Sequence, residues 1–106
     1  RNSLDWAGRY AAVLPCADCE GIDTVVTLHM DGTFSRQSRY LGKSDRVFSD
    51  TGSFGWDASG SAVTLVTKQG TAQAYKVGEN RLIHLDQSGR PITGALAAHY
   101  VLLKTR

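Results

Sequence analysis

The chain has 106 residues, of which 42% are hydrophobic and 21% are charged, as expected of one small globular domain. Its net charge of +2 is too small, and its basic residues are too scattered, to indicate a nucleic-acid-binding surface. No apolar run approaches the roughly 18 residues of a transmembrane helix, and the first residues do not form a signal peptide. We expect residues 1–5 to be a linker and residues 6–106 to form a single domain.

Runs with strand composition begin at the first apolar residues. The first two predicted strands are residues 6–14 and 22–30, and Pro15 ends the first because proline cannot donate to a strand ladder. The dipeptide Asp31-Gly32 then predicts a hairpin into a third strand, residues 33–41.

The second half of the chain predicts more strands. Residues 42–50 are mostly polar and are predicted to be the longest loop. Four further strands are predicted at residues 51–57, 62–67, 71–77 and 81–86, and a last one at about residues 92–104. The alanines of that last segment would suit a helix, but Tyr100-Val101 and the missing caps favour a strand. About eight strands with regular turns predict an all-β antiparallel up-and-down meander that closes into a small barrel.

Both cysteines lie in one Cys-x-x-Cys sequence, Cys16 to Cys19, between the first two predicted strands. A redox-active dithiol is disfavoured, because no helix is predicted after it and the charges of Asp18 and Glu20 would raise the pKa of the thiols. A local disulfide is the favoured interpretation, and closing so small a loop would stabilise the fold by about 2 kcal/mol.

A metal site at Cys16 and Cys19 is the remaining alternative. It would require reduced cysteines, and two thiolates without a second ligand pair suit a soft ion such as Cu(I) better than zinc. The three histidines share no motif with each other or with the cysteines. They are His29, His84 and His99.

No catalytic signature is present, so we do not expect an enzyme. Gly-x-Ser-x-Gly is absent, and Asp31, Asp57 and Asp86 stand at predicted turns, where aspartate is common. Aromatic residues could instead line a small-molecule cavity inside the barrel, although they would more often fill the core. The candidates for such a cavity are Phe34, Tyr40, Phe54, Trp56 and Tyr100.

Several short motifs together resemble one family. They are Leu14-Pro15-Cys16-Ala17-Asp18-Cys19-Glu20-Gly21-Ile22, then Leu28-x-x-Asp31-Gly32-Thr33-Phe34, and Tyr40-x-Gly42. The chain is similar in these motifs to the N-terminal domain of NlpE-like outer-membrane lipoproteins, from about Gly8 to Lys104. The first motif is the specific one, since the turns alone occur in many β proteins.

The resemblance implies a lipocalin-like barrel in the periplasm of a Gram-negative bacterium. It implies attachment to the inner leaflet of the outer membrane through an acylated cysteine upstream of Arg1. It also implies roles in copper homeostasis and in envelope-stress and surface sensing through the Cpx pathway, with signalling proteins as partners. The suggested copper or redox role would fall on Cys16 and Cys19. The alternative function is a lipocalin-like binder of a small hydrophobic ligand.

Overall fold

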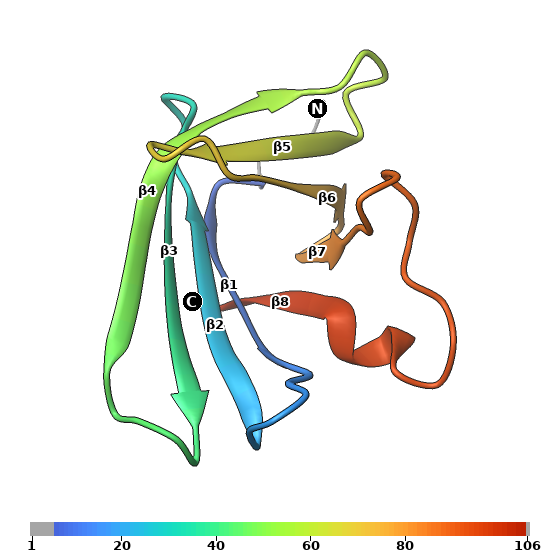
Figure 1. Ribbon diagram of the computed structural model, residues 1–106. Coiled ribbons are helices and arrows are strands. Elements are labelled where there is room, and N and C mark those ends of the chain that lie inside the picture. The colour runs from blue at the N-terminus through green and yellow to red at the C-terminus, as the bar shows by residue number, and fades with distance from the viewer. Residues whose placement is uncertain (1–5, 106) are drawn as a thin grey trace.

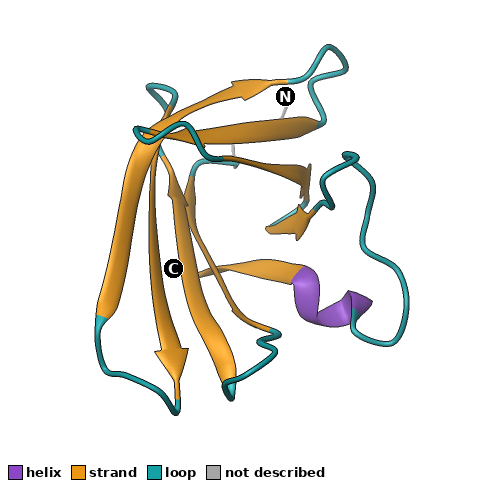
Figure 2. Cartoon of the chain, in the orientation of Figure 1, coloured by secondary structure: helices purple, strands orange, loops and turns teal. Residues whose placement is uncertain are grey.

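The computed structural model describes residues 6–105, so the predicted linker 1–5 lies outside the described residues. It contains eight strands and one 3-10 turn: β1 (Gly8–Leu14), β2 (Gly21–Leu28), β3 (Thr33–Leu41), β4 (Val47–Trp56), β5 (Ala62–Thr67), β6 (Ala72–Gly78), β7 (Arg81–His84), η1 (Ala97–Tyr100) and β8 (Val101–Thr105). Each strand pairs antiparallel with the next, and β8 pairs with β1 (Figures 1 and 2). The predicted all-β meander that closes into a barrel is confirmed.

The core is formed by the residues that alternate inward along these strands. In β2, for example, Thr24, Val26 and Leu28 are buried, and Val26 stands opposite the buried Tyr10 of β1. Burial of one face and exposure of the other follow from the two-residue period of a strand. The buried apolar cluster consists of Tyr10, Val26, Leu28, Phe34, Val63, Leu65, Tyr75, Leu82 and Leu102.

The predicted hairpin at Asp31-Gly32 is present, but its loop is longer than two residues. β2 ends at Leu28, and the His29 N–H donates to the Thr33 carbonyl at 2.9 Å. The Asp31 carboxylate accepts hydrogen bonds from the Thr33 N–H and hydroxyl, while Gly32 takes a φ of +89°. The turn therefore includes residues 29–32, and Met30, which was predicted to be in the strand, is exposed.

The prediction that residues 42–50 form the longest loop was wrong. β4 begins at Val47, and its register with β3 is continuous from Arg39 opposite Val47 to Thr33 opposite Ser53. Val47 and Phe48 have high strand propensity, and pairing with residues 33–39 of β3 extends the strand into this polar stretch. The loop between the two strands is accordingly only residues 42–46.

The prediction of one strand over residues 92–104 was also wrong. A 3-10 turn occupies Ala97–Tyr100, and β8 begins only at Val101. Alanine is disfavoured in strands, whereas Val101 and its neighbours have strand propensity, so the change of structure follows the change of composition. No helix among residues 6–105 is long and apolar enough to cross a bilayer.

The strands are longer on one side of the barrel than on the other. β2, β3 and β4 are long, whereas β5 pairs with β4 only from Gly52 to Trp56. The first half of β4 therefore extends beyond β5, as the lower part of the green strand in Figure 1 shows. One end of the barrel is consequently open, and the loop that carries Cys16 and Cys19 lies at this end.

Candidate functional site

The Cys16–Cys19 loop joins β1 to β2 and is held closely against the neighbouring strands. Gly21, the first residue of β2, is buried, and a Cβ atom at this position would lie 2.5 Å from the Cγ1 atom of Val13. The Glu20 N–H donates to the Leu41 carbonyl at the end of β3, at 3.1 Å. Glycine and this backbone hydrogen bond therefore fix where the loop returns to the barrel.

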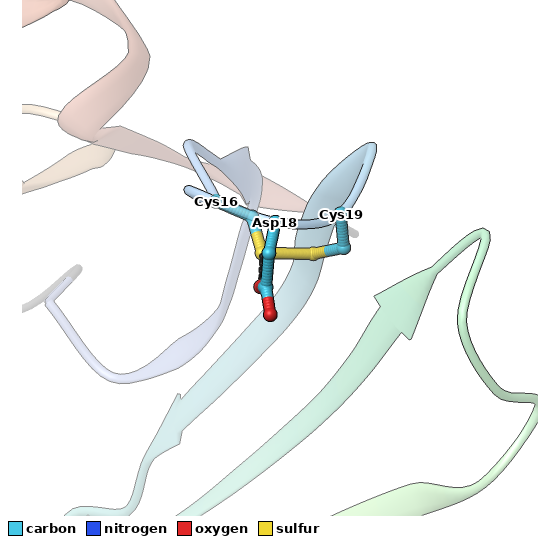
Figure 3. Close-up of side chains that lie close together, drawn as sticks. All are labelled: Cys16, Asp18 and Cys19. Atoms are coloured by element: carbon cyan, nitrogen blue, oxygen red, sulfur yellow. Dashed lines mark hydrogen bonds between the residues drawn. A yellow bond between two sulfur atoms is a disulfide. The ribbon is translucent and has the colours of Figure 1, made fainter.

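Cys16 and Cys19 are joined by a disulfide, with their Cα atoms 5.4 Å apart (Figure 3). The predicted local disulfide is confirmed. Asp18 Oδ1 lies 3.5 Å from the Cys16 sulfur, and the Gly21 carbonyl lies 3.4 Å from the Cys19 sulfur. A disulfide sulfur has no proton to donate, so these are close contacts with oxygen rather than hydrogen bonds.

The carboxylate of Asp18 is held in its charged form. Lys43 Nζ, from the loop between β3 and β4, donates to Asp18 Oδ2 at 2.7 Å. This hydrogen bond and the charge of Lys43 lower the pKa of the Asp18 carboxyl below its usual value. A fixed negative charge therefore lies beside the two sulfurs and would disfavour thiolates after reduction.

Cys16, Asp18 and Cys19 also form a group of possible metal ligands. Their ligand atoms lie within 4.8 Å of one another. The disulfide form does not offer thiolates, so coordination requires reduction of the bond. Reduced, the group supplies two soft sulfur ligands and one carboxylate, a set that suits Cu(I) at the sulfurs.

The three histidines do not join this group. His29 lies exposed in the turn after β2, and His99 lies exposed in η1. His84 is on β7, where its ring contacts those of Tyr75 and Tyr100 at centroid distances of 5.4 and 5.5 Å. Burial lowers the pKa of the His84 imidazole and so favours its neutral form.

Sequence reasoning missed a polar cluster inside the open half of the barrel. Arg36 of β3 forms an ion pair with Asp50 of β4 at 2.8 Å, and its guanidinium also interacts with the hydroxyl of Tyr75. Burial raises the pKa of that hydroxyl. The signal was available, because Arg36 follows Phe34 by two residues and so shares its inward face.

The five aromatic candidates for a ligand cavity are distributed over different parts of the molecule. Phe34 is a core residue, and Phe54 and Trp56 pack edge-on against Trp6 at centroid distances of 5.6 and 5.5 Å. Tyr100 contacts His84. Tyr40 lies at the open end of the barrel, where it packs edge-on against Phe48 at 5.7 Å.

A cleft of about 510 Å³ lies at this open end. Tyr40 and Phe48 supply its apolar wall, and Arg36, Asp50 and Lys43 supply charged groups. The remaining residues of its lining are Ser38 and Ser44. Of the five aromatic candidates, Tyr40 is the one that contacts this cleft.

An eight-stranded meander barrel whose first hairpin carries a Cys-x-x-Cys disulfide defines the class of this protein. Residues 10–95 match the family described as the NlpE N-terminal domain, so the chain belongs to that family. It is 37% identical over 87 residues to Lipoprotein NlpE of Escherichia coli (strain K12), a match that covers 82% of this chain and 35% of the relative. The chain thus spans about a third of the length of that relative.

Two solved structures share this fold. A candidate lipoprotein from Shewanella oneidensis superposes with a TM-score of 0.86 at 50% sequence identity, over 97% of this chain and 92% of that one. The Cpx pathway activator NlpE from Escherichia coli superposes with a TM-score of 0.72 at 34% identity, over 83% of this chain and 46% of that one. The two solved structures therefore resemble this chain in sequence as well as in fold.

Proposed function

We propose that this chain is a non-enzymatic NlpE-type lipoprotein domain, anchored to the outer membrane and facing the periplasm, that takes part in envelope-stress signalling. Its Cys16–Cys19 loop reports redox or copper state to signalling partners. The proposal rests on one observation above all, the Cys16–Cys19 disulfide in a loop at the open end of an NlpE domain. The relative described as a Cpx pathway activator supports the signalling part.

The loop has the chemistry of a two-state element. A dithiol can reduce the Cys16–Cys19 bond to two thiols by supplying two electrons and two protons. The dithiol is itself oxidised to a disulfide in this exchange. The thiols lose their protons on binding Cu(I), which two sulfur ligands suit. Asp18 opposes thiolate formation in the absence of metal, so the disulfide is the resting form in an oxidising compartment.

The copper part is tested by titrating the reduced protein with Cu(I) in the presence of a competing chromophoric chelator. We expect one Cu(I) per chain and loss of this binding in the Cys16→Ser/Cys19→Ser double variant. The double variant His29→Gln/His99→Gln is the matched control and should bind as the parent does. Tight binding that persists in the cysteine double variant would rule out a copper role for this loop.

The redox part is tested by counting free thiols on protein trapped with acid and alkylated directly from cells. We expect both cysteines to be protected as a disulfide in unstressed cells and to become alkylated when a membrane-impermeant reductant is added. Fully alkylated cysteines in unstressed cells would exclude the disulfide as the resting state.

A lipocalin-like binder of a small hydrophobic ligand is the second candidate function. The cleft with the exposed Tyr40–Phe48 pair favours it, because an aromatic wall beside polar groups is typical of ligand sites. Displacement of a fluorescent fatty acid by laurate tests it, with Phe48→Ser as the variant. Absence of any fatty-acid fluorescence change, together with no bound molecule in native mass spectrometry, would retire this candidate.

A further inference from the structure

The first half of β4 is a strand with one unpaired edge. Residues 47–51 pair with β3, but the register between β4 and β5 begins only at Gly52. Among residues 6–105 no other strand pairs with residues 47–50, and Figure 1 shows this part of β4 with β3 as its one neighbour. Closure of the barrel does not reach this segment, which therefore keeps a free edge.

The backbone groups at this edge can be assigned from the alternation of the ladder. The Phe54 N–H donates to the Gly32 carbonyl on the β3 side, and the Thr51 carbonyl accepts from the Lys68 N–H on the β5 side. The register is regular, so even-numbered residues of β4 face β3 and odd-numbered ones face away. The N–H and C=O groups of Val47 and Ser49 therefore point outward from the sheet edge.

This edge has neither proline nor a bulge, two features that usually protect a free strand edge from pairing. Its one inward-pointing charge, that of Asp50, is paired with Arg36 at 2.8 Å. Val47 and Phe48 are 53% and 42% exposed, and the cleft with Tyr40 lies directly beside Phe48. A second strand laid along this edge would cover apolar surface as well as satisfy the backbone groups.

The charged side chains at the two ends of the edge indicate which charge a strand that pairs there would carry. Arg46 precedes the edge, with its guanidinium 5.0 Å from the centroid of the Phe48 ring, and Lys68 lies beside Thr51 at the other end. Neither side chain forms an ion pair with a carboxylate in the described part of the chain. Of the nearby acids, Asp50 pairs with Arg36 at 2.8 Å, and the exposed Asp45 lies 3.9 Å from Arg39.

We propose that the β4 edge, residues 47–51, binds an extended acidic segment of a partner protein as an added strand. The segment hydrogen-bonds to the outward groups of Val47 and Ser49, and its alternate side chains cover Phe48 and Tyr40. Carboxylates near its two ends meet Arg46 and Lys68. Five residues of strand span about 17 Å, so the recognised segment is about five to seven residues long. The inference does not depend on the redox or copper chemistry of the cysteine loop.

The direct test uses a fluorescein-labelled peptide, Glu-Val-Thr-Val-Thr-Glu with a C-terminal amide, and fluorescence anisotropy. Ser49→Pro removes the outward N–H of Ser49 and leaves the ladder to β3 intact, because the backbone groups of Ser49 do not face β3. We expect this variant to bind at least about tenfold more weakly, whereas Ser49→Thr binds like the parent. Two altered peptides, one with both glutamates replaced by lysine and one with alternate backbone nitrogens methylated, should also bind at least about tenfold more weakly.

A measurement on the unaltered protein tests the same contact without the Ser49→Pro variant, in case that variant does not fold. Hydrogen exchange followed by NMR should show that the peptide slows exchange at Val47 and Ser49 but leaves Phe48, whose N–H already faces β3, unchanged. Binding weaker than about 1 mM, equal binding of the methylated peptide, or no protection at Val47 and Ser49 would overturn the proposal. Peptide-free self-association that Ser49→Pro abolishes would also overturn it, since the edge would then serve a second copy of this chain.

Discussion

Lys43 Nζ donates a 2.7 Å hydrogen bond to Asp18 Oδ2, and this contact joins the disulfide loop to the loop between β3 and β4. The two residues are 25 positions apart in the chain, and both side chains are largely exposed. Lys43 also lines the cleft at the open end of the barrel. A movement of the cysteine loop that displaces Asp18 would therefore also affect Lys43, and with it one side of the cleft.

Removing this contact should be visible in the titration of Asp18. Lys43 is the main cause of the lowered pKa of the Asp18 carboxyl, so Lys43→Met should raise that pKa toward its usual value. Carboxyl carbon chemical shifts measured from pH 2 to pH 6 check this. Lys68→Met, which removes a lysine remote from Asp18, should leave the titration unchanged, and an unchanged midpoint in Lys43→Met would contradict the assigned cause.

Loss of the disulfide should lower stability without changing the fold. In the chain-entropy description a loop this short contributes about 2 kcal/mol, so Cys16→Ser/Cys19→Ser should lower the free energy of unfolding by about that amount. Urea denaturation of the parent with and without reductant, beside the double variant, measures it. We expect the reduced parent and the double variant to coincide. An unchanged unfolding midpoint would show that the disulfide places no constraint on the unfolded chain.

The ion pair of Arg36 inside the open half of the barrel should contribute more to the free energy of unfolding than the exposed ion pairs of Arg39. Arg36→Met leaves Asp50 without its partner in a half-buried position, and we expect a loss of about 1–2 kcal/mol in the free energy of unfolding. Arg39→Met is the matched control. Its contacts to Asp23 and Asp45 are 3.9 Å long and exposed, so it should cost less than about 0.5 kcal/mol. Equal losses in denaturant titrations of the two variants would contradict this ranking.

The partly buried His84 should give the fold a pH dependence near neutrality. Burial lowers the pKa of its imidazole in the folded chain, whereas in the unfolded chain the value is about 6.5. Below that pH the unfolded chain binds a proton that the folded chain does not, so the free energy of unfolding should fall as pH drops from 7 to 5. His84→Gln should flatten this slope. His99→Gln, at an exposed position, should keep the parental slope in urea titrations at each pH.

Two glycines of β4 should respond differently to the same substitution. A Cβ atom at Gly52 would lie 2.0 Å from the Val66 carbonyl oxygen, whereas at Gly55 it would meet no atom within 4 Å. Gly52→Ala must therefore displace the backbone of β5 and should cost about 3 kcal/mol. Gly55→Ala should be neutral or slightly stabilising. Thermal unfolding of both variants compares them, and a similar loss in the two would contradict close contact at Gly52.

The sequence predicted the parts of the fold that depend on local pattern. Asp31-Gly32 specified a hairpin, and residues 62–67 were predicted as a short strand at its observed bounds, because turn chemistry and strand composition act over a few residues. The segments that were mispredicted depend on a distant partner. Residues 42–50 were predicted to be a loop because the stretch as a whole is mostly polar, but the ladder to β3 makes residues 47–50 part of a strand.

The candidate site was predictable in its position and in its disulfide, since both cysteines lie in one short loop. Its electrostatic setting was not, because the partner of Asp18 is supplied by Lys43 of another hairpin. The interior cluster was missed for a similar reason. The strand period places Arg36 on the inner face, but the position of Asp50 opposite it depends on the extension of β4 that the sequence did not indicate.

The order of the strands has a consequence for how the chain folds. Seven of the ladders join strands that are consecutive in sequence, and the pairing of Arg9 with Thr105 belongs to the one ladder that joins the two ends of the described chain. The loop-closure entropy is therefore small for the ladders joined by short turns, larger for β7–β8, which residues 85–100 connect, and largest for the β1–β8 ladder. Arg9 and Thr105 are also neighbours in the β1–β8 ladder. A circular permutant that joins them by a short linker and opens the chain at another turn should therefore keep every ladder intact.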